Sequence, residues 1–503
     1  MQIEPEYSRF EQDYREGRSQ VVWTRLVADL DTPVSVMLKL ANAGKNSFML
    51  ESVTGGEIRG RYSVVGMKPD LIWRCLGDKA EINRRARFDD HAFERDDADP
   101  LASLRGVLEE SRIDLPEALP PIAAGLFGYL GYDMVRHVEH LPDINPDNLS
   151  LPDAMMIRPT VAVVIDGVKG EITVISPVWV QDGSDARAAY AQAAERVMDT
   201  VRDLERPLIE PARGLEGDLV EADPVSNTSP AEYDEIVEKA KEYIRAGDIF
   251  QVVPSQRWTL DFALPPFSLY RALRRTNPSP YMFYFNFGEF QVIGASPEIL
   301  VKVSKGKVTI RPIAGTRPRG TTTTEDLALE QDLLDDPKEL AEHLMLLDLG
   351  RNDVGRVAKI GTVNPTEQFI IERYSHVMHI VSNVEGELRE DYDALAALLA
   401  GLPAGTVSGA PKVRAMEIID ELEKEKRGVY GGGVGYFSAA GEMDICIALR
   451  TAVLKDRNLY VQAGGGVVYD SDPDAEFQET VNKSKALIQA AREAGKFPRI
   501  SGN

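Results

Sequence analysis

Two short apolar segments flank a lysine–glycine pair in Ile299-Leu-Val-Lys-Val-Ser-Lys-Gly-Lys-Val-Thr-Ile-Arg-Pro312. This arrangement is typical of two strands joined by a tight turn, here at Lys305 and Gly306. Further strands are predicted at Gln251 to Trp258, Tyr281 to Phe287, Gln291 to Gly294, Val429 to Phe437, Asp444 to Leu454 and Leu459 to Ala463. Because short connections join successive strands, we expect antiparallel pairing.

Helical segments alternate with these groups of strands. Ser229 and Pro230 suit an N-cap and a first helical position, so a helix is expected from there to about Ala246. Longer helices are predicted at Glu325 to Leu347, Pro411 to Lys424 and Ala475 to Ala494. Strands grouped apart from helices predict an α+β fold of largely antiparallel sheets packed with helices.

The first part of the chain also mixes short strands with helices. Val161 to Ile165 and Ile172 to Ile175 predict a hairpin, and Asp185 to Leu204 predicts an amphipathic helix. Residues 205–230 carry Pro, Gly, Asp and Ser without apolar periodicity, which is typical of a linker. We therefore expect an N-terminal lobe over residues 1–210, a linker over 211–229 and a C-terminal domain over 230–495.

The chain has 503 residues and a net charge of −23, from 57 basic and 80 acidic residues. Such an acidic protein is a poor general ligand for nucleic acid or an anionic membrane. It has no signal-like N-terminus and no apolar run of the roughly 18 residues that a membrane span needs. Cys75 and Cys446 both lie in apolar segments, which favours reduced core residues and a cytoplasmic protein.

Two pairs of glutamates share one spacing: Glu339 with Glu342, and Glu476 with Glu479. Each pair lies in a predicted helix, where residues three apart share a face. A single pair of this kind is more often a solvated helix face. If the fold brings the two pairs together, four carboxylates meet and need a cation between them. Mg²⁺, which prefers oxygen ligands, is the expected ion.

Two glycine-rich runs, Tyr430 to Tyr436 and Ala463 to Tyr469, lack the order of a dinucleotide-binding motif, and Gly405 to Lys412 lacks that of a phosphate loop. The glycines either form strand bulges or let backbone N–H groups approach a carboxylate ligand. His379 is either structural or a general acid, and a nearby acidic site would raise its pKa.

Six motifs then occur in order along the second half of the chain. They are Pro312-Ile-Ala-Gly-Thr-Arg317, Asp348-Leu-Gly-Arg-Asn-Asp353, Arg373-Tyr-Ser-His-Val-Met-His379, Gly405-Thr-Val-Ser-Gly-Ala-Pro-Lys412, Tyr430-Gly-Gly-Gly-Val-Gly-Tyr436 and Glu476-Phe-Gln-Glu-Thr-Val-Asn-Lys483. Together they resemble the chorismate-utilising enzymes, most closely the anthranilate synthase large subunits within that family. Met49-Leu-Glu-Ser52 and Gly60-Arg-Tyr-Ser63 resemble the family's N-terminal half, so two intercalated lobes are implied.

The resemblance implies a role for each matching position. Glu342 and Glu479 are the implied Mg²⁺ ligands, with Glu339 and Glu476 as supporting carboxylates. Substrate contacts are implied for Gly315, Thr316, Tyr430, Arg450, Gly464, Gly465, Gly466 and Lys483. Arg450 would bind the enolpyruvyl carboxylate in bidentate fashion, with Thr406 near the same end. His379 would protonate the departing ring hydroxyl.

The implied reaction is that of a Mg²⁺-dependent carbon–oxygen lyase. Ammonia adds to the ring of chorismate as the hydroxyl leaves, which gives aminodeoxyisochorismate, and loss of pyruvate then gives anthranilate for tryptophan biosynthesis. A separate glutamine amidotransferase subunit would supply the ammonia, because neither Cys75 nor Cys446 lies in a G-x-C-x-G motif. Two of each chain are expected.

Two positions favour this branch of the family. Relatives that add water resemble one another in having a lysine base where Gln251 stands, and a neutral amide cannot deprotonate water. Aminodeoxychorismate synthases typically carry a lysine where Ala314 stands. The alternatives are an aminodeoxychorismate synthase component I and, from another class, a non-catalytic sensor of aromatic acids.

A regulatory site is implied by Leu50-Glu-Ser52 together with Asn277-Pro-Ser-Pro-Tyr-Met282. These segments resemble a tryptophan feedback site, in which Glu51, Ser52, Pro280, Tyr281 and Met282 would hold the inhibitor between the lobes. The alternative is that Pro280 and Tyr281 form an ordinary turn into a strand.

Overall fold

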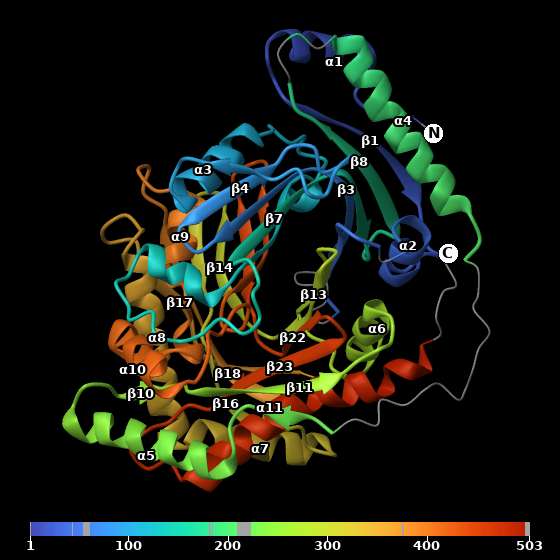
Figure 1. The fold of residues 1–503 in the computed structure, drawn as a ribbon. Coiled ribbons are helices and arrows are strands. Elements are labelled where there is room, and N and C mark those ends of the chain that lie inside the picture. The colour runs from blue at the N-terminus through green and yellow to red at the C-terminus, as the bar shows by residue number, and fades with distance from the viewer. Residues whose placement is uncertain are drawn as a thin grey trace.

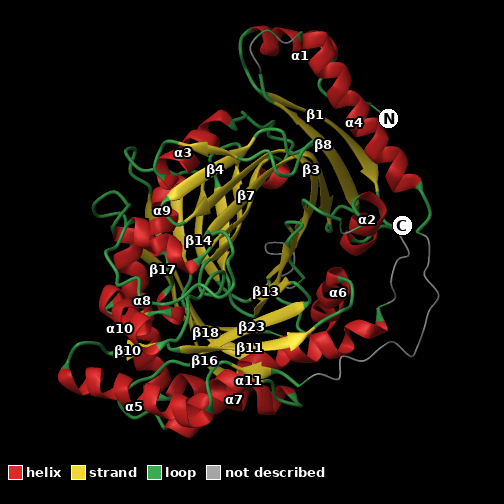
Figure 2. Cartoon of the chain, in the orientation of Figure 1, coloured by secondary structure: helices red, strands yellow, loops and turns green. Residues whose placement is uncertain are grey.

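A computed structural model describes residues 2–42, 44–53, 61–180, 183, 185–208, 223–374 and 377–497. Strands form the interior and helices lie outside them (Figures 1 and 2). The helices are α1 (Tyr7–Arg15), α2 (Pro33–Leu40), α3 (Pro100–Glu110), α4 (Ala186–Glu205), α5 (Pro230–Ala246), α6 (Pro266–Thr276), α7 (Thr323–Asp335), α8 (Pro337–Gly355), α9 (Ala394–Gly401), α10 (Lys412–Leu422) and α11 (Pro473–Glu493).

Neighbouring strands pair antiparallel, as in β3–β7, β12–β13 and β22–β23, so the predicted α+β class is confirmed. The N-terminal strands are β1 (Gln20–Val27), β2 (Ser47–Glu51), β3 (Tyr62–Leu76), β4 (Lys79–Asn83), β5 (Glu94–Asp96), β6 (Gly125–Leu130), β7 (Ala154–Asp166) and β8 (Glu171–Val178). The later strands are β9 (Val225–Ser226), β10 (Gln251–Val252), β11 (Ser255–Asp261), β12 (Tyr281–Asn286), β13 (Phe290–Ser296), β14 (Ile299–Ser304), β15 (Lys307–Ile310), β16 (Ile313–Pro318), β17 (Asn364–Arg373), β18 (Val377–Glu387), β19 (Gly409–Ala410), β20 (Gly433–Ser438), β21 (Met443–Ile447), β22 (Thr451–Lys455) and β23 (Asn458–Gly464).

Strands from the two ends of the sequence alternate in space. β2 lies between β3 and β12, and β6 lies between β7 and β20. One hydrophobic cluster contains Met49 and Val65 together with Tyr270 and Met282. The lobes are therefore intercalated, as the family resemblance implies.

Local signals in the sequence explain several elements. α5 begins with a capping box, in which the Ser229 side chain accepts from the Glu232 N–H and the Glu232 side chain accepts from the Ser229 N–H. It ends at Gly247, whose φ of 83° suits glycine. Lys305 and Gly306 have φ values of 50° and 74°, the pair of positive angles that a tight hairpin turn requires. Both predictions are confirmed.

Other predicted boundaries are wrong. The single helix predicted over Glu325 to Leu347 is two helices, α7 and α8, because the residue before Pro337 is driven out of the helical region. Pro254 separates β10 from β11, and the segment that contains Arg450 separates β21 from β22. β20 begins only at Gly433. β16, β17 and β18, which flank the site described below, were not predicted.

The predicted linker falls largely outside the described residues, which omit 209–222. Its last residues form β9, which pairs with β11. The extents of the predicted N-terminal lobe and C-terminal domain stay predictions. Among the described residues, no helix is long and apolar enough to cross a membrane. Cys75 and Cys446 are both buried and free, as expected.

Candidate active site

The glycine run after β23 lies at the centre of the predicted site. A Cβ atom on Gly464 would stand 2.9 Å from Tyr430 Oη, and one on Gly465 would stand 3.1 Å from Glu476 Oε2. At Gly466 the corresponding distance to Gln251 Nε2 is 2.5 Å. The missing side chains thus leave room for three polar groups from different elements to approach one backbone. The glycines therefore allow side chains of the protein to approach this backbone closely, while the approach of a ligand carboxylate stays a prediction.

The two glutamate pairs border the same backbone from different helices. Gln251 Nε2 donates to Glu342 Oε1 on α8 at 3.0 Å, while Glu476 on α11 faces Gly465. Among the described residues, however, no group of three or more His, Cys, Asp or Glu side chains is close enough to hold a metal ion. In this structure the four carboxylates form two pairs, one on α8 and one on α11, and their role as Mg²⁺ ligands stays a prediction.

Each pair contains one carboxylate with a cationic partner. Glu339 Oε1 lies 3.2 Å from Arg317, and Glu479 Oε1 lies 2.6 Å from Lys483 Nζ. Lys483 Nζ also donates to the Gly464 carbonyl at 3.0 Å, which places this amine beside the glycine run, while its contact with substrate stays a prediction.

The negative charge of the site is only partly compensated. Burial raises the pKa of Glu339, and the nearby Glu342 raises it further. Burial likewise raises the pKa of Glu476, with a further contribution from Glu479. Glu476 Oε2 is buried without a hydrogen-bond partner within the described chain, although Ser471 Oγ donates to the other oxygen at 2.7 Å. An unpartnered, desolvated carboxylate oxygen beside other carboxylates suits a bound cation.

His379 lies on β18 directly opposite Thr316 of β16. Its Nδ1 is 3.0 Å from the Gly315 carbonyl and 3.1 Å from Thr316 Oγ1. Since a carbonyl only accepts, Nδ1 carries the proton and Nε2 is left for a ligand. Burial lowers the pKa of His379, and the charge of Arg450 lowers it further, so the expected rise in its pKa is wrong.

Arg450 stands between β21 and β22 in the left-handed region, with φ of 47°. Burial lowers the pKa of its guanidinium, which nevertheless stays charged. Within the described chain, its side chain makes no hydrogen bond or ion pair. A half-buried guanidinium without an anionic partner is suited to bind a carboxylate in bidentate fashion. The position of Arg450 therefore fits its predicted contact.

Comparison with known proteins decides the family. The sequence pattern of the chorismate binding enzymes matches residues 48–489. The chain is 70% identical over 498 residues to anthranilate synthase component 1 of Cereibacter sphaeroides, and the alignment covers 99% of both chains. The chain belongs to the chorismate-binding enzyme family. It is also 51% identical to anthranilate synthase component 1 of Pseudomonas aeruginosa, over 92% of this chain and 94% of that one.

Solved structures share the chorismate-binding fold. Anthranilate synthase component I from Streptococcus pneumoniae is 40% identical, with a TM-score of 0.75 over 87% of this chain and 94% of that one. The menaquinone-specific isochorismate synthase of Escherichia coli is 20% identical, with a TM-score of 0.69 over 96% and 99% of the two chains. The second likeness shows the fold alone.

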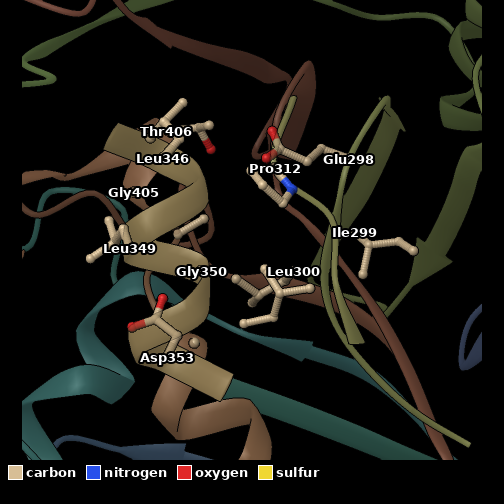
Figure 3. Close-up of a pocket in the computed structure, with 13 residues that line it drawn as sticks. Glu298, Ile299, Leu300, Pro312, Leu346, Leu349, Gly350, Asp353, Gly405 and Thr406 are labelled. Carbon is tan, nitrogen blue, oxygen red and sulfur yellow. The ribbon is translucent and has the colours of Figure 1, made fainter. Parts of the chain in front are cut away.

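One residue of this chorismate-binding enzyme that sequence reasoning missed is Glu298. It lies between β13 and β14, and it lines a cavity of about 20 Å³ together with Thr406. Figure 3 shows the Glu298 carboxylate and the Thr406 hydroxyl pointing toward one another. Burial raises the pKa of Glu298 to about 8, and the Thr406 hydroxyl only partly offsets this rise. Glu298 is therefore a protonated, buried acid at neutral pH.

A second cavity, of about 520 Å³, lies between the lobes of the enzyme. Its lining includes all five residues of the predicted regulatory site: Glu51, Ser52, Pro280, Tyr281 and Met282. The Glu51 carboxylate is already engaged, since it accepts from Arg274 at 2.6 and 2.7 Å and from Tyr270 at 2.8 Å. The fold thus brings the predicted residues together, and Glu51 also ties β2 to α6.

Proposed function

We propose that this chain is the large subunit of an anthranilate synthase. It would convert chorismate and ammonia into anthranilate and pyruvate through aminodeoxyisochorismate. The observation that carries the proposal is 70% identity over the full length to a protein of that name. Gln251 supports the same choice, because its amide is hydrogen-bonded to Glu342 where a water-adding enzyme would need a base.

The two carboxylates of chorismate would be bound at opposite ends of the site. The Arg450 guanidinium would take the enolpyruvyl carboxylate, near Thr406. Tyr430, whose pKa is raised to about 12 by burial, stays neutral and is able to donate a hydrogen bond beside Gly464. Gly315 and Thr316, together with the glycine run at 464–466, would contact the ring. These groups orient the substrate before any bond changes.

Mg²⁺ would be held by Glu342 and Glu479, with Glu339 and Glu476 as supporting charges. Mg²⁺ usually binds one or two protein carboxylates and completes its shell with water and substrate, so two separate pairs are enough. When bound, the ion anchors and polarises the ring carboxylate. Lys483, which now pairs with Glu479, would remain beside the glycine run through its bond to the Gly464 carbonyl.

Two residues are able to handle the proton of the departing ring hydroxyl. His379 was the predicted acid, but its lowered pKa leaves Nε2 unprotonated at neutral pH. Glu298 holds its proton up to about pH 8, and Thr406 faces it. We therefore assign proton donation to Glu298 and a hydrogen-bonding contact with the substrate to His379 Nε2.

Ammonia would come from a glutamine amidotransferase subunit, in an assembly of two of each chain. The name component 1 of the relatives implies a second component and supports this partner.

The 520 Å³ cavity would bind tryptophan, which would act as a feedback inhibitor. The enzyme would work in the cytoplasm. An aminodeoxychorismate synthase would instead release a product that keeps its pyruvyl group, and a non-catalytic sensor would release none.

The test is purified chain with chorismate, Mg²⁺ and ammonium salt at alkaline pH, followed by anthranilate fluorescence. We expect anthranilate and pyruvate in equal amounts, loss of activity in EDTA and its return with Mg²⁺. Glu342→Gln should lower kcat/KM at least about 100-fold and weaken Mg²⁺ binding measured by calorimetry. Glu235→Gln, on the exposed face of α5, is the matched control. An amino-chorismate product, or full activity without metal, would refute the proposal.

A further inference from the structure

Tyr374 contacts both the 520 Å³ cavity and His379. It follows β17, and its side chain lines the 520 Å³ cavity together with Pro280, Tyr281 and Met282. Its ring also packs edge-on against the imidazole of His379, with centroids 5.6 Å apart and an angle of 62° between the rings. One aromatic ring therefore contacts both the proposed inhibitor site and a residue of the proposed catalytic site.

A charged network holds this ring in place. Tyr374 Oη donates to Glu372 Oε2 at 2.9 Å. The two terminal nitrogens of Arg311 donate to the two Glu372 oxygens at 2.8 and 2.6 Å, so the arginine binds this carboxylate in bidentate fashion. Arg311 is buried and lines the same cavity as Tyr374. A ligand that moves either side chain therefore disturbs the anchor of the other.

The backbone provides a second route between the same two places. Arg311 and Ile313 line the cavity, and β16, which begins at Ile313, continues to Gly315 and Thr316, which contact His379 Nδ1. Glu372 lies directly opposite His379 where β17 pairs with β18. This part of the cavity wall and the supports of His379 thus lie in or next to the paired strands β16, β17 and β18, which restricts how far one can move without the others.

We propose that Tyr374 is a positioning residue for His379 and couples the occupancy of the cavity to catalysis. The inference rests on the proposed function for its ligand, tryptophan, an aromatic amino acid of a size that this cavity admits. A ligand that packs against Tyr374 favours a different ring position from the one that supports His379. The equilibrium then shifts toward an arrangement with impaired chemistry, without contact between inhibitor and substrate.

The experiment compares Tyr374→Leu and Tyr374→Phe with Tyr436→Leu. Tyr436 also lines the cavity, but its ring stacks on Phe127 instead of His379, which makes it a matched control. Three quantities are measured for each protein: kcat and KM for chorismate, the Kd of tryptophan by calorimetry, and the rate that remains at saturating tryptophan. Thermal unfolding confirms that each variant is folded.

We expect Tyr374→Leu to lower kcat at least about 5-fold with KM changed less than about 3-fold, since positioning acts on the chemical step. Its residual rate at saturating tryptophan, relative to its own uninhibited rate, should rise at least about 5-fold while Kd stays within about 3-fold. Tyr374→Phe keeps the ring and should lie between wild type and Tyr374→Leu. Tyr436→Leu alters the cavity wall without touching His379, so whatever its Kd for tryptophan, its residual fraction at saturating tryptophan should match that of wild type.

Two outcomes separate the failure of this inference from the failure of the proposed regulation. If tryptophan binds and inhibits the wild type, but Tyr374→Leu is inhibited as fully and keeps its kcat, the coupling role is refuted. If the wild type binds no tryptophan, the regulatory ligand is wrong. The kcat of Tyr374→Leu without tryptophan then decides the positioning role, which an unchanged kcat would refute.

Discussion

Glu298 illustrates how burial changes the chemistry of a single side chain. Its folded-state pKa of about 8 lies above the ordinary value of 4.5, because the ionised form loses its hydration in the interior. Since the folded state binds the proton more tightly, the stabilising contribution is complete below about pH 4.5. It is lost progressively as the pH rises through about 8.

Glu298→Gln should therefore reveal two separate effects. Relative to wild type, the variant should gain stability as the pH rises from 5 to 8, by on the order of 3 kcal/mol in the free energy of unfolding. Denaturant titrations at several pH values measure this difference. If Glu298 donates the proton, kcat should also fall at least about 100-fold, since an amide has no acidic proton. Equal kcat in the two proteins would exclude the donor role, and a stability difference independent of pH would exclude the raised pKa.

Sequence reasoning proposed residues that share a spacing, such as Glu342, or that the family resemblance implies, such as Arg450. Glu298 escaped because a lone glutamate between two apolar strands gives no hint of whether it is paired, solvated or buried. The direction of the pKa shift of His379 likewise could not be predicted from the sequence. It depends on burial and on the charge of Arg450, a residue 71 positions further along the chain.

At the scale of elements, the glycine run at 464–466, which leads from β23 toward α11, has no side chains to keep neighbouring residues away from its backbone. A Cβ atom on Gly466 would lie 2.5 Å from Gln251 Nε2 and 3.9 Å from Glu342 Oε1. The Gln251 side chain would have to move away, and its 3.0 Å hydrogen bond to Glu342 would break. The segment thus fixes how closely β10, α8 and α11 approach each other.

We expect Gly466→Ala to lower kcat/KM for chorismate at least about 10-fold, because displaced site residues no longer orient the substrate. The matched control is Gly106→Ala on α3, where the added Cβ meets no atom of the described chain within 4 Å. That control should keep its kcat/KM and gain about 0.5–1 kcal/mol of stability from better helix propensity. Steady-state kinetics and thermal unfolding test both expectations. Equal kinetics in the two variants would contradict the close-approach interpretation.

Elements with local signals were predicted well, and elements without them were not. The capping box at Ser229 and the turn at Lys305 act through neighbouring residues, so both were visible in the sequence. The break before Pro337 was also signalled locally, by the proline itself, but the predicted helix was continued across it. β17 and β18 are irregular, with register shifts between Pro365 and Glu367 and between Glu367 and Ile370, so no clean alternation marks them.

At the scale of the whole molecule, neither half of the sequence encloses its own core. One edge of β2 is paired with β12, and one edge of β6 is paired with β20, so each N-terminal strand forms backbone hydrogen bonds with a strand from the second half of the chain. The buried Glu51 carboxylate is neutralised by Arg274 of α6, which lies 223 residues further along the chain. Breaking a fully buried ion pair typically costs about 3–5 kcal/mol, and the cost for this pair is smaller because the Arg274 side chain is 34% exposed. Even so, the cost is a sizeable share of the roughly 5–15 kcal/mol that stabilises a typical domain.

A chain divided between residues 208 and 223 tests this interdependence. Expressed alone, residues 1–208 should lack a cooperative unfolding transition and expose apolar surface to a hydrophobic dye, because β2 and β6 would become open edges and Glu51 would be buried without a cation. Co-expressed with residues 223–503, the same fragment should form a soluble complex that elutes with its partner and unfolds in a single transition near that of the intact chain. The predicted boundary between lobes would then mark a division of the sequence and not of the folding unit. An isolated fragment 1–208 that unfolds cooperatively would show instead that the N-terminal lobe folds by itself, and that its strands join a preformed partner.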